Sequence, residues 1–143
     1  MSALTLNYVV PGDDFTREGE ASSDVKHKLK QIGYDSEVIR RVAIAMYEGE
    51  INMVIHAGGG EAFVEIDPEK IYIRLEDHGP GIKDVSQAMK EGWSTAPDNV
   101  RALGFGAGMG LPNIKKYSDD LKIDTKLGEG TTLHITVLAK GNS

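Results

Sequence analysis

The amino-acid sequence predicts an α/β protein, a two-layer α/β sandwich in which helices cover one face of a mostly antiparallel sheet. Three observations lead to this prediction. Segments typical of strands and helices follow one another in the order β, α, α, β, β, loop, α, β, β. The later strand segments come in neighbouring pairs joined by short turns, which is typical of antiparallel pairing. The longest helical segment carries an apolar stripe, so it has a face to bury against a sheet.

The first strand and the first helix are bounded by residues that break regular structure. Residues 4–10 have the pattern of a strand, and the Pro-Gly-Asp-Asp run at 11–14 ends it. Ser22 or Ser23 is the expected N-cap of the first helix, because a hydroxyl oxygen accepts a hydrogen bond from a backbone N–H of the first turn. Gly33 is the expected C-terminal stop of this helix.

A second helix and a hairpin are expected next. Ser36 is the expected N-cap of this helix, and Gly58 ends it. Strands are predicted at 62–66 and 71–77, on either side of a turn at 67–70. The helix has apolar residues at helical spacing, which are Val38, Val42, Ala45, Met46 and Ile55.

The C-terminal half begins with a long segment that has little periodic structure. This segment covers residues 79–111, and a loop of that size in a compact domain usually has a function. A short helix is expected within it at 84–91. A further helix is predicted at 112–118, since a proline suits its first turn. The last two strands are predicted at 121–125 and 131–138.

Length and composition narrow the class of protein. A chain of 143 residues is expected to form one domain, residues 1–143. The net charge of −6 argues against nucleic acid or anionic lipid as partners, and the lack of cysteine excludes disulfides and thiolate chemistry. No apolar run approaches ~18 residues and no secretion signal is evident, so the expected location is the cytoplasm.

Glu48, Asn52 and His56 lie four residues apart on the second helix and therefore share one face. Two interpretations stay open from this spacing. The face is either a polar stripe at the edge of a buried surface, or a carboxylate and an amide oxygen directed into a cleft. A carboxylate can take a proton from a hydroxyl group, and an amide oxygen is a neutral hard ligand that suits Mg²⁺.

Three glycine-containing stretches each allow a structural and a functional interpretation. The Asp-His-Gly-Pro-Gly run at 77–81 is a strand end with a turn, or a site where Asp77 accepts a hydrogen bond from an exocyclic amine. Residues 104–112 have glycine at every second position before a helix, which predicts a phosphate site, with a flexible linker as the alternative. The run at 128–132 is a hairpin turn, or it presents threonine hydroxyls to a ligand.

The order of these motifs resembles that of the GHKL ATPases, a family that includes gyrase-type ATPases, Hsp90, MutL, sensor histidine kinases and anti-sigma-factor serine kinases. The helix face at 48–56 resembles their N box, and residues 77–81 look like their G1 box. Residues 104–111 look like the G2 box, and residues 130–132 look like the last glycine-threonine motif. The resemblance spans about residues 36–138 and implies the Bergerat ATP-binding fold, which agrees with the predicted sandwich.

A domain of this length is similar to the anti-sigma kinases and to the RsbT-like switch kinases. Residues 92–96 and 101–114 are similar to the lid of the RsbT-like group, and the run at 14–17 is similar to its N-terminal part. One departure is that family N boxes commonly have small residues where this chain has Glu50 and Met53. Glu50 is expected to point away from the side of the helix that carries the predicted site.

The resemblance implies Mg·ATP as the ligand and gives each motif a role. Glu48 would be the general base for a substrate hydroxyl, Asn52 would hold Mg²⁺ against the phosphates, and Asp77 would bind the adenine amine. Such a site works mainly by positioning and charge neutralisation. The other nucleotide-binding residues implied by the same motifs are His56, Gly79, Gly81, Ile82, Gly104, Gly106, Gly108, Met109, Gly110, Leu111, Thr131 and Thr132.

By the same resemblance, the chain is expected to be a serine/threonine kinase of the RsbT-like group. Its acceptor would be a serine or threonine of a STAS-domain antagonist protein, and once released it would bind a PP2C-type phosphatase. Two other functions stay open, an anti-sigma factor that binds a sigma factor directly and a non-catalytic ATP-binding module. The presence of Glu48 argues against the last, since such a module needs no base. A homodimer stays open as well.

Overall fold

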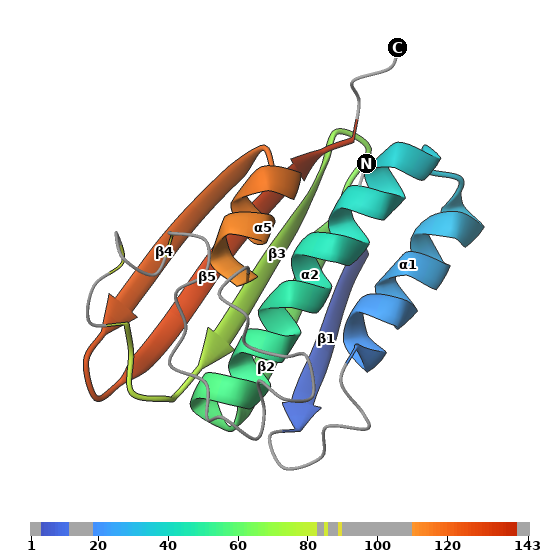
Figure 1. Cartoon of the computed structure of the whole chain (residues 1–143). Helices are drawn as coiled ribbons and strands as arrows, with labels where there is room; N and C mark the ends of the chain where they lie inside the picture. Colours follow the sequence, from blue (N-terminus) through green and yellow to red (C-terminus); the bar gives the residue numbers. More distant parts are fainter. Residues whose placement is uncertain (1–3, 12–18, 83–84, 86–88, 90–109, 140–143) are drawn as a thin grey trace, which may run out of the picture.

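Figure 1 shows the computed structural model, which describes residues 4–11, 19–82, 85, 89 and 110–139. The order of its strands and helices is the predicted one. The elements are β1 (Leu4–Pro11), α1 (Glu20–Ile32), α2 (Ser36–Ala57), β2 (Gly59–Ile66), β3 (Lys70–Asp77), α5 (Gly110–Tyr117), β4 (Asp120–Lys126) and β5 (Gly130–Leu138).

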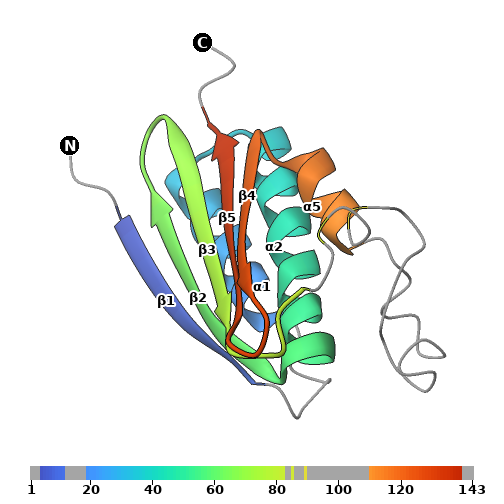
Figure 2. The same ribbon diagram turned by 90° about the vertical axis from the view of Figure 1, so that its left-hand side faces the viewer.

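The five strands form one sheet in the order β1-β2-β3-β5-β4, and every neighbouring pair is antiparallel. The register places Ala62 opposite Leu75, and Leu75 opposite Leu133. Apolar residues at alternate positions therefore line one face of the sheet. Figure 2 shows α1, α2 and α5 together on one side of the sheet, so the predicted two-layer sandwich is confirmed.

The core lies between this sheet face and the helices. Most of the stripe predicted on α2 is buried, whereas Ile55 is only half-buried. Towards its end α2 buries Met53 and Val54 instead, because the helix passes over the start of β2, where the Met53 sulfur lies close to Gly60. The end of the helix thus contacts β2 at Gly60, the residue that pairs with Asp77 at the start of the predicted G1 box.

The predicted caps of the two helices are wrong at their N-termini. Gly19 precedes α1, and Ser22 lies within the first turn, where its hydroxyl donates to the Gly19 carbonyl at 3.2 Å. The carboxylate of Glu50 accepts hydrogen bonds from the first backbone N–H groups of α1. It therefore caps the helix in place of the predicted serine. At α2 the cap is Asp35, which precedes Ser36 and accepts from the Glu37 N–H at 3.2 Å.

The predicted C-terminal stops of both helices are confirmed. Gly33 has φ 103° and Gly58 has φ 72°, both in the left-handed region. L-residues with a side chain rarely adopt this conformation, so glycine ends each helix. The N–H of Gly33 donates to the Leu29 carbonyl at 3.0 Å.

The second face of the sheet carries polar and aromatic side chains. The ring of Tyr72 contacts Phe63 edge-on and stacks against His134. The Tyr72 hydroxyl lies 2.6 Å from His134 Nδ1, and His134 Nε2 lies 2.9 Å from an oxygen of Asp124. Thr132 belongs to this same face, because side chains alternate along β5 and Thr131, its neighbour, is buried towards the helices.

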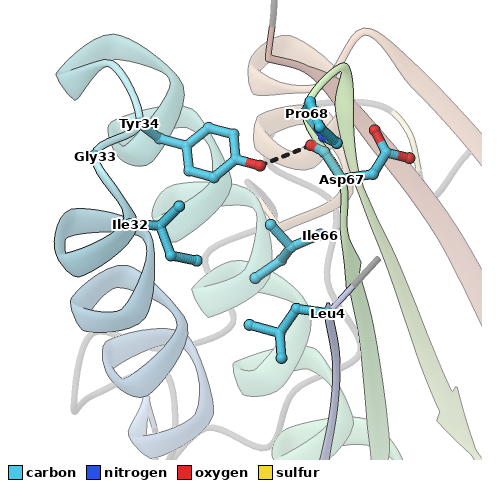
Figure 3. Close-up of a pocket in the computed structure, with 7 residues that line it drawn as sticks. All are labelled: Leu4, Ile32, Gly33, Tyr34, Ile66, Asp67 and Pro68. Carbon is cyan, nitrogen blue, oxygen red and sulfur yellow. Dashed lines mark hydrogen bonds between the residues drawn. The ribbon is translucent and has the colours of Figure 1, made fainter. Parts of the chain in front are cut away.

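A pocket of about 410 Å³ lies between the end of α1 and the turn from β2 to β3 (Figure 3). The Tyr34 hydroxyl closes one side by donating to the Asp67 carbonyl at 2.7 Å. The Asp67 carboxylate accepts from the backbone N–H groups of Glu69 and Lys70 within the turn. The pocket lies at the end of the sheet opposite to Asp77, and its lining is largely apolar, so it is not the predicted phosphate site.

No helix in the described ranges is long and apolar enough to cross a membrane.

Candidate functional site

The predicted face of α2 lies beside α5 and the end of β3. Glu48, Asn52 and His56 are all half-buried, and each lies near a different neighbour. Glu48 accepts a hydrogen bond from Asn113 of α5 at 3.1 Å, between Oε2 and Nδ2. The Asn52 side chain lies against Gly110, the first residue of α5. The face therefore lies at the edge of the contact between α2 and α5, with its three polar side chains half-buried.

Glu48 has the properties expected of a base. Burial raises the pKa of its carboxyl above the usual value, and the hydrogen bond from Asn113 opposes this by favouring the ionised form. A carboxylate with a raised pKa takes a proton from a hydroxyl group more readily near neutral pH. Its position within the 22-residue helix α2 fixes the backbone that carries this carboxyl.

The contact between Asn52 and Gly110 is tight and favours glycine. A Cβ atom on Gly110 would lie 3.0 Å from Asn52 Oδ1 and 3.2 Å from Nδ2, which is closer than side chains normally approach. The start of α5 thus lies directly beside the amide of Asn52. The first backbone N–H groups of a helix lack partners within the helix and attract anions, so an amide oxygen and an anion-binding helix end meet here.

Asp77 joins three segments at the end of β3. One oxygen, Oδ1, accepts from the backbone N–H groups of Gly79 and Thr131, each at 3.0 Å. These bonds fix the orientation of the carboxylate and engage one of its two oxygens. Gly130 precedes Thr131 with φ 128°, and a Cβ there would lie 2.1 Å from the Asp77 carbonyl oxygen. The backbone at this point has no room for a side chain.

The turn after Asp77 packs against the last turn of α2 and the β4–β5 turn. A Cβ on Gly79 would lie 2.5 Å from that of Ala57, and Gly81 has φ 82°. The N–H of Ile82 donates to the Thr125 hydroxyl at 2.8 Å, and the same hydroxyl lies 2.9 Å from that of Thr131. The turn that carries Gly79 and Gly81 and the start of β5 at Thr131 thus meet at the end of β3.

His56 lies in the last turn of α2 beside the turn that follows Asp77, where a Cβ on Gly79 would lie 3.3 Å from the His56 carbonyl oxygen. Burial lowers the pKa of its imidazole, and the charge of Asp77 opposes this. A lowered pKa keeps the ring neutral at pH 7, so His56 adds no positive charge to the site.

Two predicted nucleotide-binding side chains are placed elsewhere. Thr132 lies on the uncovered face of the sheet, since strand alternation separates its side chain from that of Thr131. The Leu111 side chain is buried in the core and anchors the first turn of α5, which leaves only its backbone near the helix start. Both residues match the family motif in sequence, but neither side chain lies with Glu48 and Asn52.

The rest of the predicted phosphate loop lies outside the described residues. This concerns Gly104, Gly106, Gly108 and Met109, together with the lid-like stretches at 14–17, 92–96 and 101–109. Of the expected helix at 84–91, only Val85 and Met89 are described, and the Met89 N–H donates to the Val85 carbonyl at 3.0 Å, the spacing of one helical turn. Gly110 and the residues after it are the described part of this motif. The loop stays a prediction.

The sequence interpretation missed two residues that contact the site. Asn113 holds Glu48, and its position three residues after Gly110 on the same helix was a usable signal, because residues at that spacing share a face. Thr125 links the 79–82 turn to β5, and this required knowledge of how β4 pairs with β5.

The donor set suits Mg²⁺ bound together with phosphate oxygens. In the part of the chain that the structure describes, no cluster of three His, Cys, Asp or Glu residues is arranged to hold a metal ion. Mg²⁺ commonly keeps several waters and binds through few protein oxygens plus substrate phosphates. The Asn52 amide beside the start of α5 fits such a shared site.

Comparison with known protein families identifies the class of protein to which this chain belongs. The family model described as the histidine kinase-like ATPase domain matches residues 15–137. The chain therefore belongs to the histidine kinase-like ATPase family, of which GHKL is the other name used above. This confirms the resemblance drawn from the order of the motifs.

Two relatives narrow the subgroup that the chain resembles. It is 31% identical over 112 residues to the serine/threonine-protein kinase RsbT of Bacillus subtilis (strain 168), which covers 76% of this chain and 78% of the relative. It is 26% identical over 114 residues to an anti-sigma F factor of Bacillus licheniformis, which covers 76% and 75%. The chain is thus similar both to a kinase and to an anti-sigma factor.

Two solved structures share the fold. The structure of the RsbU and RsbW domains of Rv1364c from Mycobacterium tuberculosis aligns with a TM-score of 0.60 at 16% identity, covering 94% of this chain and 32% of that one. The mycobacterial sensor histidine kinase MprB aligns with a TM-score of 0.53 at 17% identity, covering 94% and 97%. At these identities the likeness concerns the fold alone.

Proposed function

We propose that this chain is an ATP-dependent serine/threonine protein kinase of the RsbT-like switch group and that its acceptor is a STAS-domain antagonist protein. The observation that carries the proposal is the pairing of a half-buried glutamate, Glu48, with Asn52 one helical turn further on, beside the start of α5. A base and a metal-binding amide on one rigid helix suit phosphoryl transfer. The similarity to the kinase RsbT supports the same proposal.

Each part of the site has a task in this proposal. The other oxygen of Asp77, Oδ2, would accept from the adenine amine, while Oδ1 stays bound to the backbone. Asn52 would hold Mg²⁺, which supplies positive charge against the phosphates when bound. Glu48 would accept the proton of the acceptor hydroxyl. The first N–H groups of α5 would donate to phosphate oxygens.

The test is phosphoryl transfer by the purified full chain. Incubation with Mg·ATP labelled at the γ-phosphate and a STAS-domain protein should label one serine or threonine of that protein. Glu48→Ala should still bind ATP in calorimetry but lose transfer, because only the base is removed. Full transfer by Glu48→Ala would disprove the assigned base, and binding of ATP without any transfer by the unmodified chain would disprove the kinase.

A second candidate function is direct binding of a sigma factor, which the similarity to the anti-sigma F factors favours. Size-exclusion chromatography of the chain with a sigma factor, with and without ATP, distinguishes this case. A stable complex with a sigma factor and none with STAS or PP2C-type proteins would favour the anti-sigma function. The same elution profile without partners tests for a homodimer.

A further inference from the structure

Helix α5 runs antiparallel to α2, and its first turn contacts the proposed catalytic face at two points. Gly110 lies against Asn52, and three residues later Asn113 donates to Glu48 at 3.1 Å. From Gly110 to Asn113 the chain advances along α5, while the contacted residue on α2 moves back one turn, from Asn52 to Glu48. Both contacts therefore come from one short rigid element that packs along the catalytic helix.

We propose that Asn113 is a positioning residue, which holds Glu48 through Oε2 so that Oε1 faces the acceptor hydroxyl. The inference rests on the proposed kinase function and deepens it. A glutamate side chain has three rotatable bonds and loses considerable rotamer freedom when it is held in one orientation. A hydrogen bond to one carboxylate oxygen restricts these bonds before the acceptor arrives.

The chemistry of the amide suits this task. A lysine or arginine at the same place would form an ion pair and make the carboxylate a weaker base, and an aspartate would repel it. A neutral N–H donor favours the ionised carboxylate, and burial still leaves the pKa of Glu48 raised above its usual value. Asn113 thus orients Glu48 while the pKa of the carboxyl stays raised.

The position of Asn113 in α5 supports the same role. Asparagine is a poor helix former compared with alanine or leucine, and here it lies inside an eight-residue helix. Its neighbours Leu111 and Ile114 are buried in the core, so the helix is anchored without it. The half-buried amide of Asn113 is then available to donate its hydrogen bond to Glu48 of α2.

The kinetic test compares Asn113→Ala with Asn113→Gln and with Lys115→Ala, an exposed position on the same helix. Alanine preserves the helix, so the first variant should fold and should lose kcat by about tenfold or more, as expected for losing a hydrogen bond to a charged group. Its KM for ATP should stay within about twofold, since Asp77 and Asn52 are intact. Asn113→Gln keeps an amide donor and should restore part of kcat, and Lys115→Ala should behave as the unmodified chain.

A second measurement needs no substrate. Urea unfolding of the unmodified chain, Asn113→Ala, Glu48→Ala and the double variant gives the coupling between the two side chains. Favourable coupling together with the loss of kcat supports the inference. Zero coupling, or full kcat in Asn113→Ala from an active chain, overturns it. If the unmodified chain transfers no phosphoryl group although the coupling is present, the kinase proposal fails, and the inference fails with it.

Discussion

The buried carboxylate of Glu50 on α2 accepts a hydrogen bond from the backbone N–H of Ser22 on α1 at 2.8 Å. Its second oxygen accepts from the N–H of Ala21 at 3.2 Å, and the residue is only 2% exposed. Glu48, two residues earlier, faces α5 instead, so the two glutamates act on opposite sides of α2 as the sequence predicts. One glutamate caps a neighbouring helix and the other belongs to the site.

Replacement of Glu50 should destabilise the fold. Glu50→Ala removes both hydrogen-bond acceptors of the first turn of α1 and should cost about 3 kcal/mol in the free energy of unfolding. Urea unfolding followed by circular dichroism measures this. Glu129→Ala is the control, because Glu129 lies on the surface in an exposed ion pair and should change the free energy by less than about 1 kcal/mol. An equal loss in both variants would contradict the capping role.

The stability should also depend on pH through Glu50. Burial raises the pKa of this carboxyl above its usual 4.5, so the folded state binds the proton more tightly than the unfolded chain does. The stability that the protonated Glu50 contributes is fully present below the pKa of this group in the unfolded chain. It is lost as the pH rises through the pKa of Glu50 in the folded state. The free energy of unfolding of the unmodified chain should therefore fall relative to that of Glu50→Gln as pH rises above 4.5. A difference that is flat from pH 4 to 8 would refute this.

Asp77→Asn should weaken nucleotide binding and spare the fold. The amide oxygen can still accept from Gly79 and Thr131, but the second position becomes an N–H₂ group that faces the adenine amine donor to donor. We expect a loss of affinity for ATP of about 2 kcal/mol, roughly thirtyfold, by calorimetry. Asp124→Asn, on the uncovered sheet face, is the control and should bind normally. Equal affinity in both variants would remove Asp77 from the site.

Asn52→Ala should lose the dependence of ATP binding on Mg²⁺. The amide is the proposed metal ligand, and its removal should weaken Mg·ATP by about 2 kcal/mol while metal-free ATP is affected less. Calorimetry in the presence of Mg²⁺ and in the presence of EDTA measures the affinities for Mg·ATP and for metal-free ATP separately. Gly110→Ala should weaken Mg·ATP as well, since its Cβ would press on Asn52. Unchanged Mg·ATP affinity in Asn52→Ala would disprove the metal role.

The sequence predicts the order of elements, the antiparallel sheet and the stops at Gly33 and Gly58, because these depend on local patterns. It does not predict the caps of the helices. The acceptor for α1 comes from Glu50, about 30 positions further along the chain, and no local pattern contains that contact.

The same limit applies to the site. The spacing of Glu48, Asn52 and His56 identifies their common face, since helical periodicity is local. The role of Asn113 and the distance of Thr132 from the site depend on how α5 packs on α2 and on which face β5 buries. Adjacent threonines in a strand point to opposite faces, so a motif that includes both predicts at most one as a ligand contact.

The pairing of β3 with β5 has a consequence for the folding kinetics of the chain. It joins two hairpins, β2–β3 and β4–β5, whose paired residues are far apart in sequence, such as Ile73 and Ile135. Local hairpins form quickly, whereas pairing across so long a separation closes a large loop and is slow. Asp77 meets Thr131 only at this junction. We therefore expect the proposed adenine side of the site to assemble late in folding, so recovery of ATP binding should follow the slow phase of refolding.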